Sequence, residues 1–217
     1  MLDALFLNVR ITIVLLCLIC IFQQPKTVFA LAFESTEEAK AFETGDLKAV
    51  KQIVGQKHYF KDQPNSVIVD ALYSAIHSGN LDVVKYLKSQ GWLDNCRDNK
   101  TCRPIHAAAK QSFKTSGPII RYFISQGFSP DLVDQGGNTP LHYAARAGHI
   151  RLVKYLCELG VDPAIKNRYY KMTALEMALL DAGTGGQLSS DPKKDAQIRI
   201  GLKKVIAYLK SGQCKIQ

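Results

Sequence analysis

The residues with the clearest potential for chemistry are cysteines and histidines near the middle of the chain. Cys96, Cys102 and His106 have a spacing that could supply three ligands to a zinc ion, because thiolates and imidazoles are ligands that zinc prefers. No HExxH sequence occurs, and no set of Ser, His and Asp lies in a recognisable nucleophile motif. The sequence therefore offers one candidate metal site and no candidate catalytic centre.

A glycine-rich segment at residues 182–187, AGTGGQ, could suggest a loop that binds phosphate groups. It follows a predicted helix rather than a strand, and it lacks the Lys and the Ser or Thr of a P-loop. We interpret it as a loop insertion, and we predict neither a cofactor nor an enzyme activity.

The chain is basic and has the composition of a folded protein. Its 217 residues include 28 Lys and Arg and 19 Asp and Glu, which gives a formal net charge of +9. The chain has 47% apolar and 22% charged residues, and this composition excludes collagen-like and low-complexity proteins. The positive excess favours an acidic partner, which could be a protein, an anionic lipid or a nucleic acid.

The first thirty residues have the layout of a secretory signal peptide. Residues 11–22 form an apolar run behind Arg10, shorter than the about 20 residues of a bilayer-spanning helix. Val28 and Ala30 place small residues where a signal peptidase requires them. We predict a signal peptide at residues 1–30; an uncleaved anchor is the alternative. Cleavage leaves 26 basic and 18 acidic residues, a formal charge of +8, so the basic excess belongs to the mature domain.

Export changes how the remaining sequence is interpreted. Four cysteines remain after cleavage, in an oxidising compartment where disulfides form. DNA binding and cytosolic roles become weak hypotheses, so we expect no nucleic acid partner. We place the protein in the periplasm, with secretion as the alternative, and expect no membrane contact by the cleaved chain.

A helical motif organises the rest of the chain, and its strongest copy spans residues 138–162. Thr139 can cap a first helix, Pro140 fits its first turn, and Gly148 permits a turn into a second helix. Apolar residues recur at helical spacing in that second helix, at Ile150, Leu152, Val153 and Leu156. One helix pair cannot bury its own apolar face, so copies must stack.

Further copies occur along the chain: Gly45 and Gly79 are 34 residues apart, and Pro104 and Pro140 are 36 residues apart. GDLKAV at 45–50 and GNLDVV at 79–84 match GHIRLV at 148–153. The ends of the second helices also match, at Lys85-Tyr86-Leu87, Arg121-Tyr122-Phe123, Lys154-Tyr155-Leu156 and Ala207-Tyr208-Leu209. We predict five units, at residues 35–66, 67–100, 101–136, 137–169 and 170–211 of a domain that spans 31–217.

With TPLHYAA at residues 139–145 and Gly148-His149 after it, the chain resembles the ankyrin repeat family. The resemblance covers about residues 35–211 and implies an all-α solenoid of five helix-turn-helix units with hairpin-like loops. The terminal units depart from the pattern, as capping units do. In the third unit the turn glycine is absent, and residues 111–117 are interpreted as an insertion.

The resemblance also assigns structural roles to His106 and His142, whose rings would hydrogen-bond backbone groups and tie units together. With His106 in that role, a Cys96–Cys102 disulfide explains the two cysteines better than a zinc site does. Cys157 lies near the place to which Cys214 would return after the last helix. A second bridge and a buried free thiol at Cys157 both stay open.

Ankyrin repeat proteins bind other proteins along the face made by the first helices and loop tips. The residues that this implies here are Ser74, His77, Arg97, Lys110, Tyr143, Arg146, Arg168, Tyr169, Tyr170 and Lys171. Tyr and Arg are enriched at binding hot spots, which favours the last loop, although its tyrosines could instead cover the fifth unit. We expect a monomer that binds an acidic protein, with its excess charge on this face.

Together these inferences predict a non-enzymatic, exported protein-interaction module. One role that fits is an immunity protein that neutralises a secreted toxic effector. A scaffold or stress-protection factor for an exported enzyme, and a secreted host-directed effector, are the alternatives.

Overall fold

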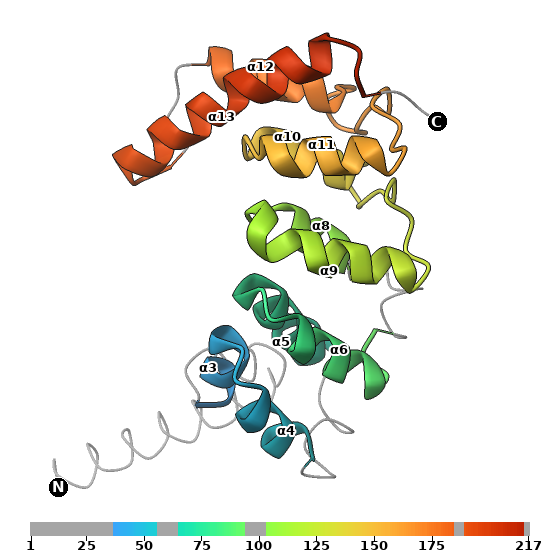
Figure 1. Cartoon of the computed structure of the whole chain (residues 1–217), viewed down its shortest axis with the longest axis vertical. Coiled ribbons are helices and arrows are strands. Elements are labelled where there is room, and N and C mark those ends of the chain that lie inside the picture. Colours follow the sequence, from blue (N-terminus) through green and yellow to red (C-terminus); the bar gives the residue numbers. More distant parts are fainter. Residues whose placement is uncertain (1–36, 56–64, 94–102, 185–188, 215–217) are drawn as a thin grey trace, which may run out of the picture.

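The computed structural model describes residues 37–55, 65–93, 103–184 and 189–214, and all regular structure in these ranges is helical (Figure 1). The helices come in pairs. The first helices are α3 (Glu37–Thr44), α5 (Asn65–Ser78), α8 (Pro104–Ala109), α10 (Pro140–Arg146) and α12 (Ala174–Gly183). The second helices are α4 (Leu47–Gly55), α6 (Leu81–Ser89), α9 (Phe113–Ser125), α11 (Ile150–Glu158) and α13 (Pro192–Lys210).

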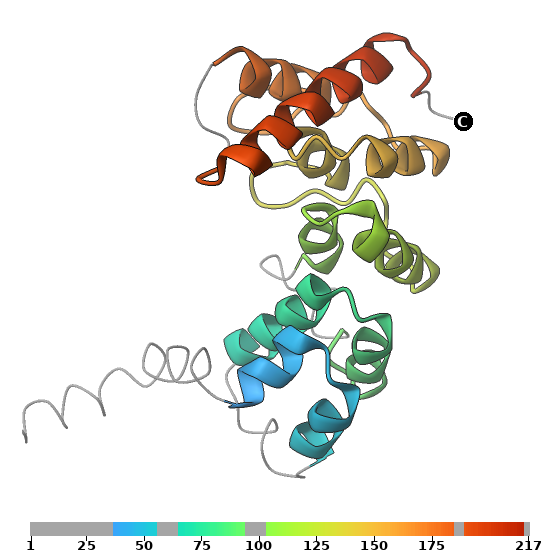
Figure 2. The same cartoon turned by 60° about the vertical axis from the view of Figure 1, so that its left-hand side comes forward.

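The pairs stack in chain order and form two layers. The first helices contact one another in sequence and make up what we call the inner layer; the second helices likewise make up the outer layer. Figures 1 and 2 show this stack from the blue N-terminal pair to the red C-terminal pair. The predicted all-helical solenoid is confirmed for the described residues, which form five helix pairs.

The local signals explain why each pair forms. Pro140 occupies the first turn of α10, and the backbone N–H of Thr139 donates to His142 Nδ1 at 3.1 Å in a capping box. Gly148 makes the turn into α11 with a φ of +68°. Leu141 is completely buried between neighbouring units, so the core is continuous along the stack.

The two histidines connect consecutive units as predicted. His142 Nε2 lies 3.1 Å from the carbonyl oxygen of Met172, and His106 Nε2 lies 3.0 Å from that of Asn138. Both rings are buried. Each imidazole therefore satisfies a backbone carbonyl of the following unit.

The predicted insertion at residues 111–117 lengthens a helix, since α9 has 13 residues whereas α11 of the fourth unit has 9. The turn between α8 and α9 is short, and residues 113–117 are the first five of α9. The absence of a Cβ at Gly117 leaves room for the Phe113 ring, because an added Cβ would lie 3.1 Å from it. A glycine and a proline that resemble loop residues in sequence are here parts of a helix.

The C-terminal helix α13 packs unusually closely on the fourth unit. A Cβ at Gly201 would collide with the carbonyl oxygen of Gly148, and a Cβ at Gly148 would lie 2.7 Å from that of Ile198. The end of the chain is also fixed covalently. Cys157 of α11 forms a disulfide with Cys214, 57 residues later, so of the two alternatives the bridge is correct.

Several predictions concern residues outside the described ranges. These are the signal peptide at 1–30, the Cys96–Cys102 disulfide and Arg97. Within the described ranges no helix is both long and apolar enough to cross a membrane.

Candidate protein-binding face

A cleft of about 360 Å³ opens on the inner layer, where α5, α8 and the loop before α10 meet. Three residues predicted for the binding face, His77, Lys110 and Tyr143, line it together. The complete lining is Tyr73, His77, Arg103, His106, Ala107, Lys110, Asp134, Gln135 and Tyr143. Stacking therefore gathers residues from three consecutive units into one site.

Hydrogen bonds fix the aromatic wall of the cleft. The hydroxyl of Tyr143 donates to Asp134 Oδ2 at 2.6 Å, and the backbone N–H of Asn138 donates to Oδ1 at 2.8 Å. Burial alone would raise the pKa of Asp134, but these hydrogen bonds outweigh it and hold the pKa below its usual value. Burial and the Asp134 carboxylate raise the pKa of Tyr143 to about 12. At neutral pH the phenol is a donor and the carboxylate an acceptor, which orients the ring.

The cations of the cleft lie beside this wall. Lys110 Nζ is 4.8 Å from the centre of the Tyr143 ring, a cation–π contact that leaves the lysine exposed. Burial, and next the Lys110 charge, lower the pKa of His77, so its imidazole is neutral near pH 7. Lys110 and Arg103 therefore provide the positive charge, and Tyr73 and His77 add polar groups.

Two lining residues with important contacts were missed by sequence reasoning. Arg103 stands where the fourth unit has Thr139, and its backbone N–H donates to the Tyr73 hydroxyl at 2.8 Å. Asp134 lies in the loop before α10 and holds Tyr143. The presence of Arg103 in place of the capping Thr could have indicated its role from the sequence. No local sequence signal indicates the role of Asp134.

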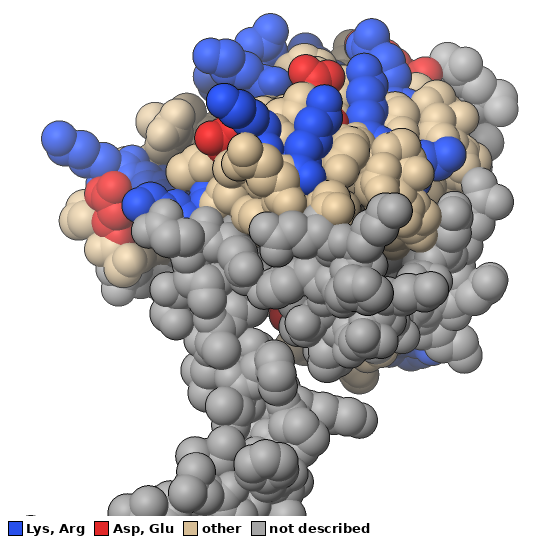
Figure 3. Space-filling view, turned by 90° about the horizontal axis from the view of Figure 1, so that it is seen from below, with Lys and Arg blue, Asp and Glu red and all other residues tan. Residues whose placement is uncertain are grey.

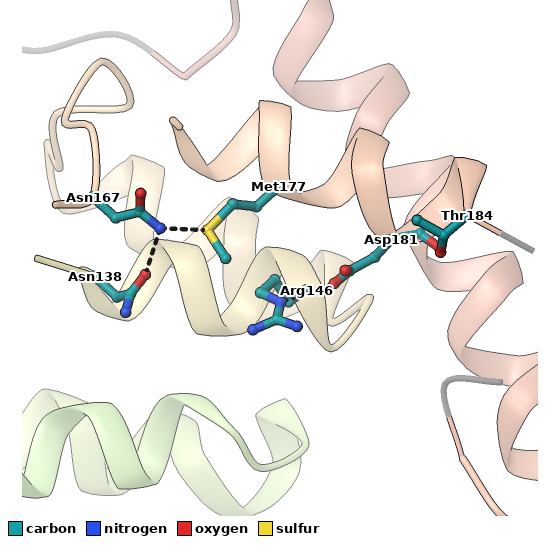
Figure 4. Close-up of polar contacts among 6 residues, drawn as sticks. All are labelled: Asn138, Arg146, Asn167, Met177, Asp181 and Thr184. Atoms are coloured by element: carbon teal, nitrogen blue, oxygen red, sulfur yellow. Dashed lines mark hydrogen bonds and ion pairs between the residues drawn. The ribbon is translucent and has the colours of Figure 1, made fainter. Parts of the chain in front are cut away.

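The loop after the fourth unit presents its tyrosines to solvent. Tyr169 is 76% exposed and Tyr170 65%, so the alternative that they cover the fifth unit is wrong. The buried Asn167 supports this loop: its Oδ1 accepts from the backbone N–H groups of Tyr170 and Met172, and its Nδ2 donates to Asn138 (Figure 4). The loop is therefore tied to the segment that follows Asp134.

Arg146 differs from its predicted role as a free binding cation. Its Nε lies 2.8 Å from Asp181 Oδ2, so it joins α10 to α12 (Figure 4). Ser74 is half-buried in α5 and does not line the cleft. Arg168 and Lys171 are exposed beside the tyrosines.

The described residues offer no other chemistry on this face. No group of three or more His, Cys, Asp or Glu side chains within them could hold a metal ion. Burial lowers the pKa of His106 to about 4, so its ring stays neutral and structural. The cleft is suited to recognising a ligand.

Comparison with known proteins agrees with the stacked helix pairs of the structure. Residues 124–178 match the family model described as ankyrin repeats in many copies. The fold is an ankyrin repeat solenoid. The chain is 36% identical over 119 residues to palmitoyltransferase Hip14 of Drosophila melanogaster, a match that covers 52% of this chain and 18% of the relative.

Two further relatives extend the comparison. The 26S proteasome non-ATPase regulatory subunit 10 of Dictyostelium discoideum is 37% identical over 84 residues, 38% of this chain and 34% of that protein. A putative ankyrin repeat protein of Rickettsia bellii is 32% identical over 133 residues, 58% of this chain and 18% of that protein. The matches cover about a third or less of these three relatives. The similarity is therefore to their ankyrin repeats, which are suited to protein binding.

Proposed function

We propose that this chain is a non-enzymatic protein-binding module and that an acidic protein docks on its inner face. The observation that carries the proposal is the cleft, where Lys110 and Arg103 lie beside an aromatic wall fixed by Asp134. A carboxylate of the partner would meet the exposed ammonium group of Lys110 beside the polar groups of Tyr73 and His77. Such charge-assisted contacts are strong when they are partly shielded from water.

The exposed tyrosine loop extends this surface. The Tyr169 ring lies against Gly136, which is next to the cleft residues Asp134 and Gln135, so the two features are continuous. Large aromatic side chains supply much of the binding energy at protein interfaces. The cleft would bind the acidic group, and the loop would supply apolar contact area.

We further propose that the protein acts outside the cytoplasm, in the periplasm, as an immunity protein that neutralises a secreted toxic effector. Residues 1–30 support export by their pattern, and the Cys157–Cys214 bridge fits an oxidising compartment. A binding module without catalytic groups is suited to blocking the surface of a toxin.

Site-specific photocrosslinking tests the docking face. A benzophenone amino acid at His77 or Tyr170 should crosslink the same acidic protein in intact cells, and Lys110→Glu should reduce both adducts. The same probe at Gln52 or Ser89, exposed residues of the outer layer, is the matched control. Equal adducts at the control positions would place the interface elsewhere.

Affinity measurements with the captured protein should agree. Tyr170→Ala should weaken binding by at least about 1 to 2 kcal/mol, with nearly unchanged thermal unfolding, because the side chain is exposed and contributes little to packing. Arg146 is unsuitable for this test, since its ion pair with Asp181 joins two units.

The immunity role has its own test. Cells that express the crosslinked partner in the periplasm should survive when they also produce this protein and die when they produce the Lys110→Glu, Tyr170→Ala variant. Undiminished killing in the presence of the parent protein would reject immunity and leave the binding function intact.

A further inference from the structure

The excess positive charge lies on the outer layer, and this differs from the sequence-based expectation. The five outer helices contain fourteen Lys and Arg residues but only three Asp and Glu. The five inner helices contain two basic and six acidic residues. The outer layer thus has a charge of +11 and the inner layer −4. Figure 3, a view of the lower end of the stack, shows Lys and Arg side chains along the upper edge of the described surface, with some Asp and Glu side chains among them.

Four of these cations form a row across the stack. Lys51, Lys85, Arg121 and Lys154 occupy the same position of four consecutive units, on helices that pack side by side. All four are exposed. Neighbouring packed helices lie about 8 to 10 Å apart, so the row presents one positive charge at roughly that interval.

Aromatic rings of the neighbouring units hold this row in place. Lys51 Nζ lies 5.7 Å from the ring centre of Tyr86, one unit further along. In the same way Arg121 lies 5.6 Å from Tyr155, and Lys154 lies 5.3 Å from Tyr208. These contacts orient the cations without neutralising them.

Carboxylates neutralise almost none of the outer charge. Of the fourteen cations, Arg199 alone has an ion pair within the described part of the chain, with Asp195 at 2.8 Å. Eleven of the fourteen are lysines. Lysine is a strongly hydrated point charge on a long stem, so eleven lysines suit non-specific attraction to a layer of negative charge, whereas arginine suits specific bidentate recognition.

The outer layer does not resemble a protein–protein interface. Specific protein interfaces have an apolar core inside a polar rim. Of the large apolar side chains that are exposed in the described ranges, Ile200 alone belongs to the outer layer. The face therefore has charge without the apolar centre that a protein partner would need.

A nucleic acid fits less well than a lipid surface. Single strands bind by stacking bases on open aromatic rings, but Tyr86, Tyr155 and Tyr208 are half-buried and have cations over them. A layer of anionic headgroups requires neither stacking nor a matching shape. It attracts any basic face by about 1 kcal/mol for each Lys or Arg that reaches it.

We propose that the outer layer is a membrane-association surface that binds anionic phospholipid headgroups through the row of Lys51, Lys85, Arg121 and Lys154. The inner face then points away from the bilayer and stays open to a protein partner. This proposal is independent of the proposed function, and it revises the expectation of no membrane contact, which rested on cleavage of residues 1–30 and not on charge.

Vesicle co-sedimentation of the full chain tests the proposal. The protein should bind vesicles of phosphatidylglycerol and phosphatidylcholine at least about tenfold more tightly than vesicles of phosphatidylcholine alone, since the neutral vesicles measure any contribution of the apolar run at 11–22. Raising the salt from about 0.1 M to about 1 M should remove the difference, because the screening length falls from about 10 to about 3 Å.

Charge-reversal variants locate the surface. Changing Lys51, Lys85, Arg121 and Lys154 to Glu should abolish the preference for anionic vesicles. If that variant fails to fold, a second variant replaces four exposed lysines that have no cation–π contact in the described structure: Lys48→Gln, Lys85→Gln, Lys114→Gln and Lys203→Gln. This variant should weaken the preference for anionic vesicles at least about fivefold. The matched control reverses four cations of the inner face and its loops, Lys110, Lys166, Arg168 and Lys171, and should retain the preference.

Two outcomes would overturn the proposal. Equal loss of vesicle binding in the outer and control variants would show an effect of net charge rather than of this face. Tighter binding of double- or single-stranded DNA than of anionic vesicles at the same salt would assign the surface to nucleic acid.

Discussion

His106 and His142 occupy the same position in consecutive units, yet their hydrogen bonds differ. Nδ1 of His142 lies 2.8 Å from the hydroxyl of Thr139. The third unit has Arg103 in place of that threonine, and the buried Nδ1 of His106 has no hydrogen-bond partner in the described structure. Burial therefore lowers the pKa of His106 to about 4.

This shift predicts a stability that depends on pH. An imidazole with a pKa near 6.5 in the unfolded chain and about 4 in the folded chain binds protons preferentially after unfolding. Stability should therefore be complete above pH 6.5, fall as the pH drops to about 4, and lose up to about 3 kcal/mol to this group. Urea unfolding across this range should show a flatter profile for His106→Gln than for His77→Gln, because His77 is less buried and its pKa is lowered less. Identical profiles would contradict the assignment.

Asn167 organises the exposed tyrosine loop by hydrogen bonds alone. Replacing it with Ala should cost about 1 to 3 kcal/mol of stability, because two backbone N–H groups lose their acceptor. Amide hydrogen exchange at Tyr170 and Met172 reports the loop directly, and Lys166→Ala is the control. Unchanged protection in Asn167→Ala would show that packing holds the loop.

Helices are positioned by small residues as much as by apolar ones. The backbone of α13 touches the turn between α10 and α11, and this approach depends on the absence of a side chain at Gly201. A glycine inside a helix ordinarily costs about 1 kcal/mol relative to alanine, so its presence here indicates a packing requirement.

Gly201→Ala should therefore destabilise the protein by about 1 to 3 kcal/mol, in spite of its better helix propensity. Gly183→Ala, at the end of α12, is the matched control, because nothing lies within 4 Å of the added Cβ. It should leave the denaturation midpoint unchanged or raise it slightly. A neutral effect of Gly201→Ala would mean that α13 shifts easily on the fourth unit.

At the scale of the whole molecule, the C-terminal cap is held by a covalent bond as well as by packing. The Cys157–Cys214 disulfide closes a loop that contains all of α12 and α13. Terminal units of a solenoid have one neighbour instead of two, so they are the first to unfold.

The Cys157→Ala, Cys214→Ala variant should lose about 2 to 4 kcal/mol of stability, since the unfolded chain regains the freedom that the bridge removes. Denaturant unfolding measures this loss, and limited proteolysis should cut first within α13. A reductant should lower the denaturation midpoint of the parent protein nearly to that of the variant. An unchanged midpoint in the variant would show that packing alone fixes the cap.

The sequence predicted those features that depend on neighbouring residues. Thr139 with Pro140 specified the start of α10, and Gly148 specified its turn, because caps and turns involve a few consecutive residues. The repeat itself predicted stacking, and the resemblance to the ankyrin family implied the inter-unit role of His142. The insertion at residues 111–117 could be found in the sequence, but only the structure showed that residues 113–117 extend α9.

By itself the sequence determined the fold, the pairing of helices and three members of the cleft, His77, Lys110 and Tyr143. The tertiary structure decided that Arg146 is paired, that Cys157 is bridged, and that the basic row lies on the layer opposite the cleft. The physical reason is distance along the chain. Caps and turns are local, whereas partners that come from different units meet only after the units have stacked.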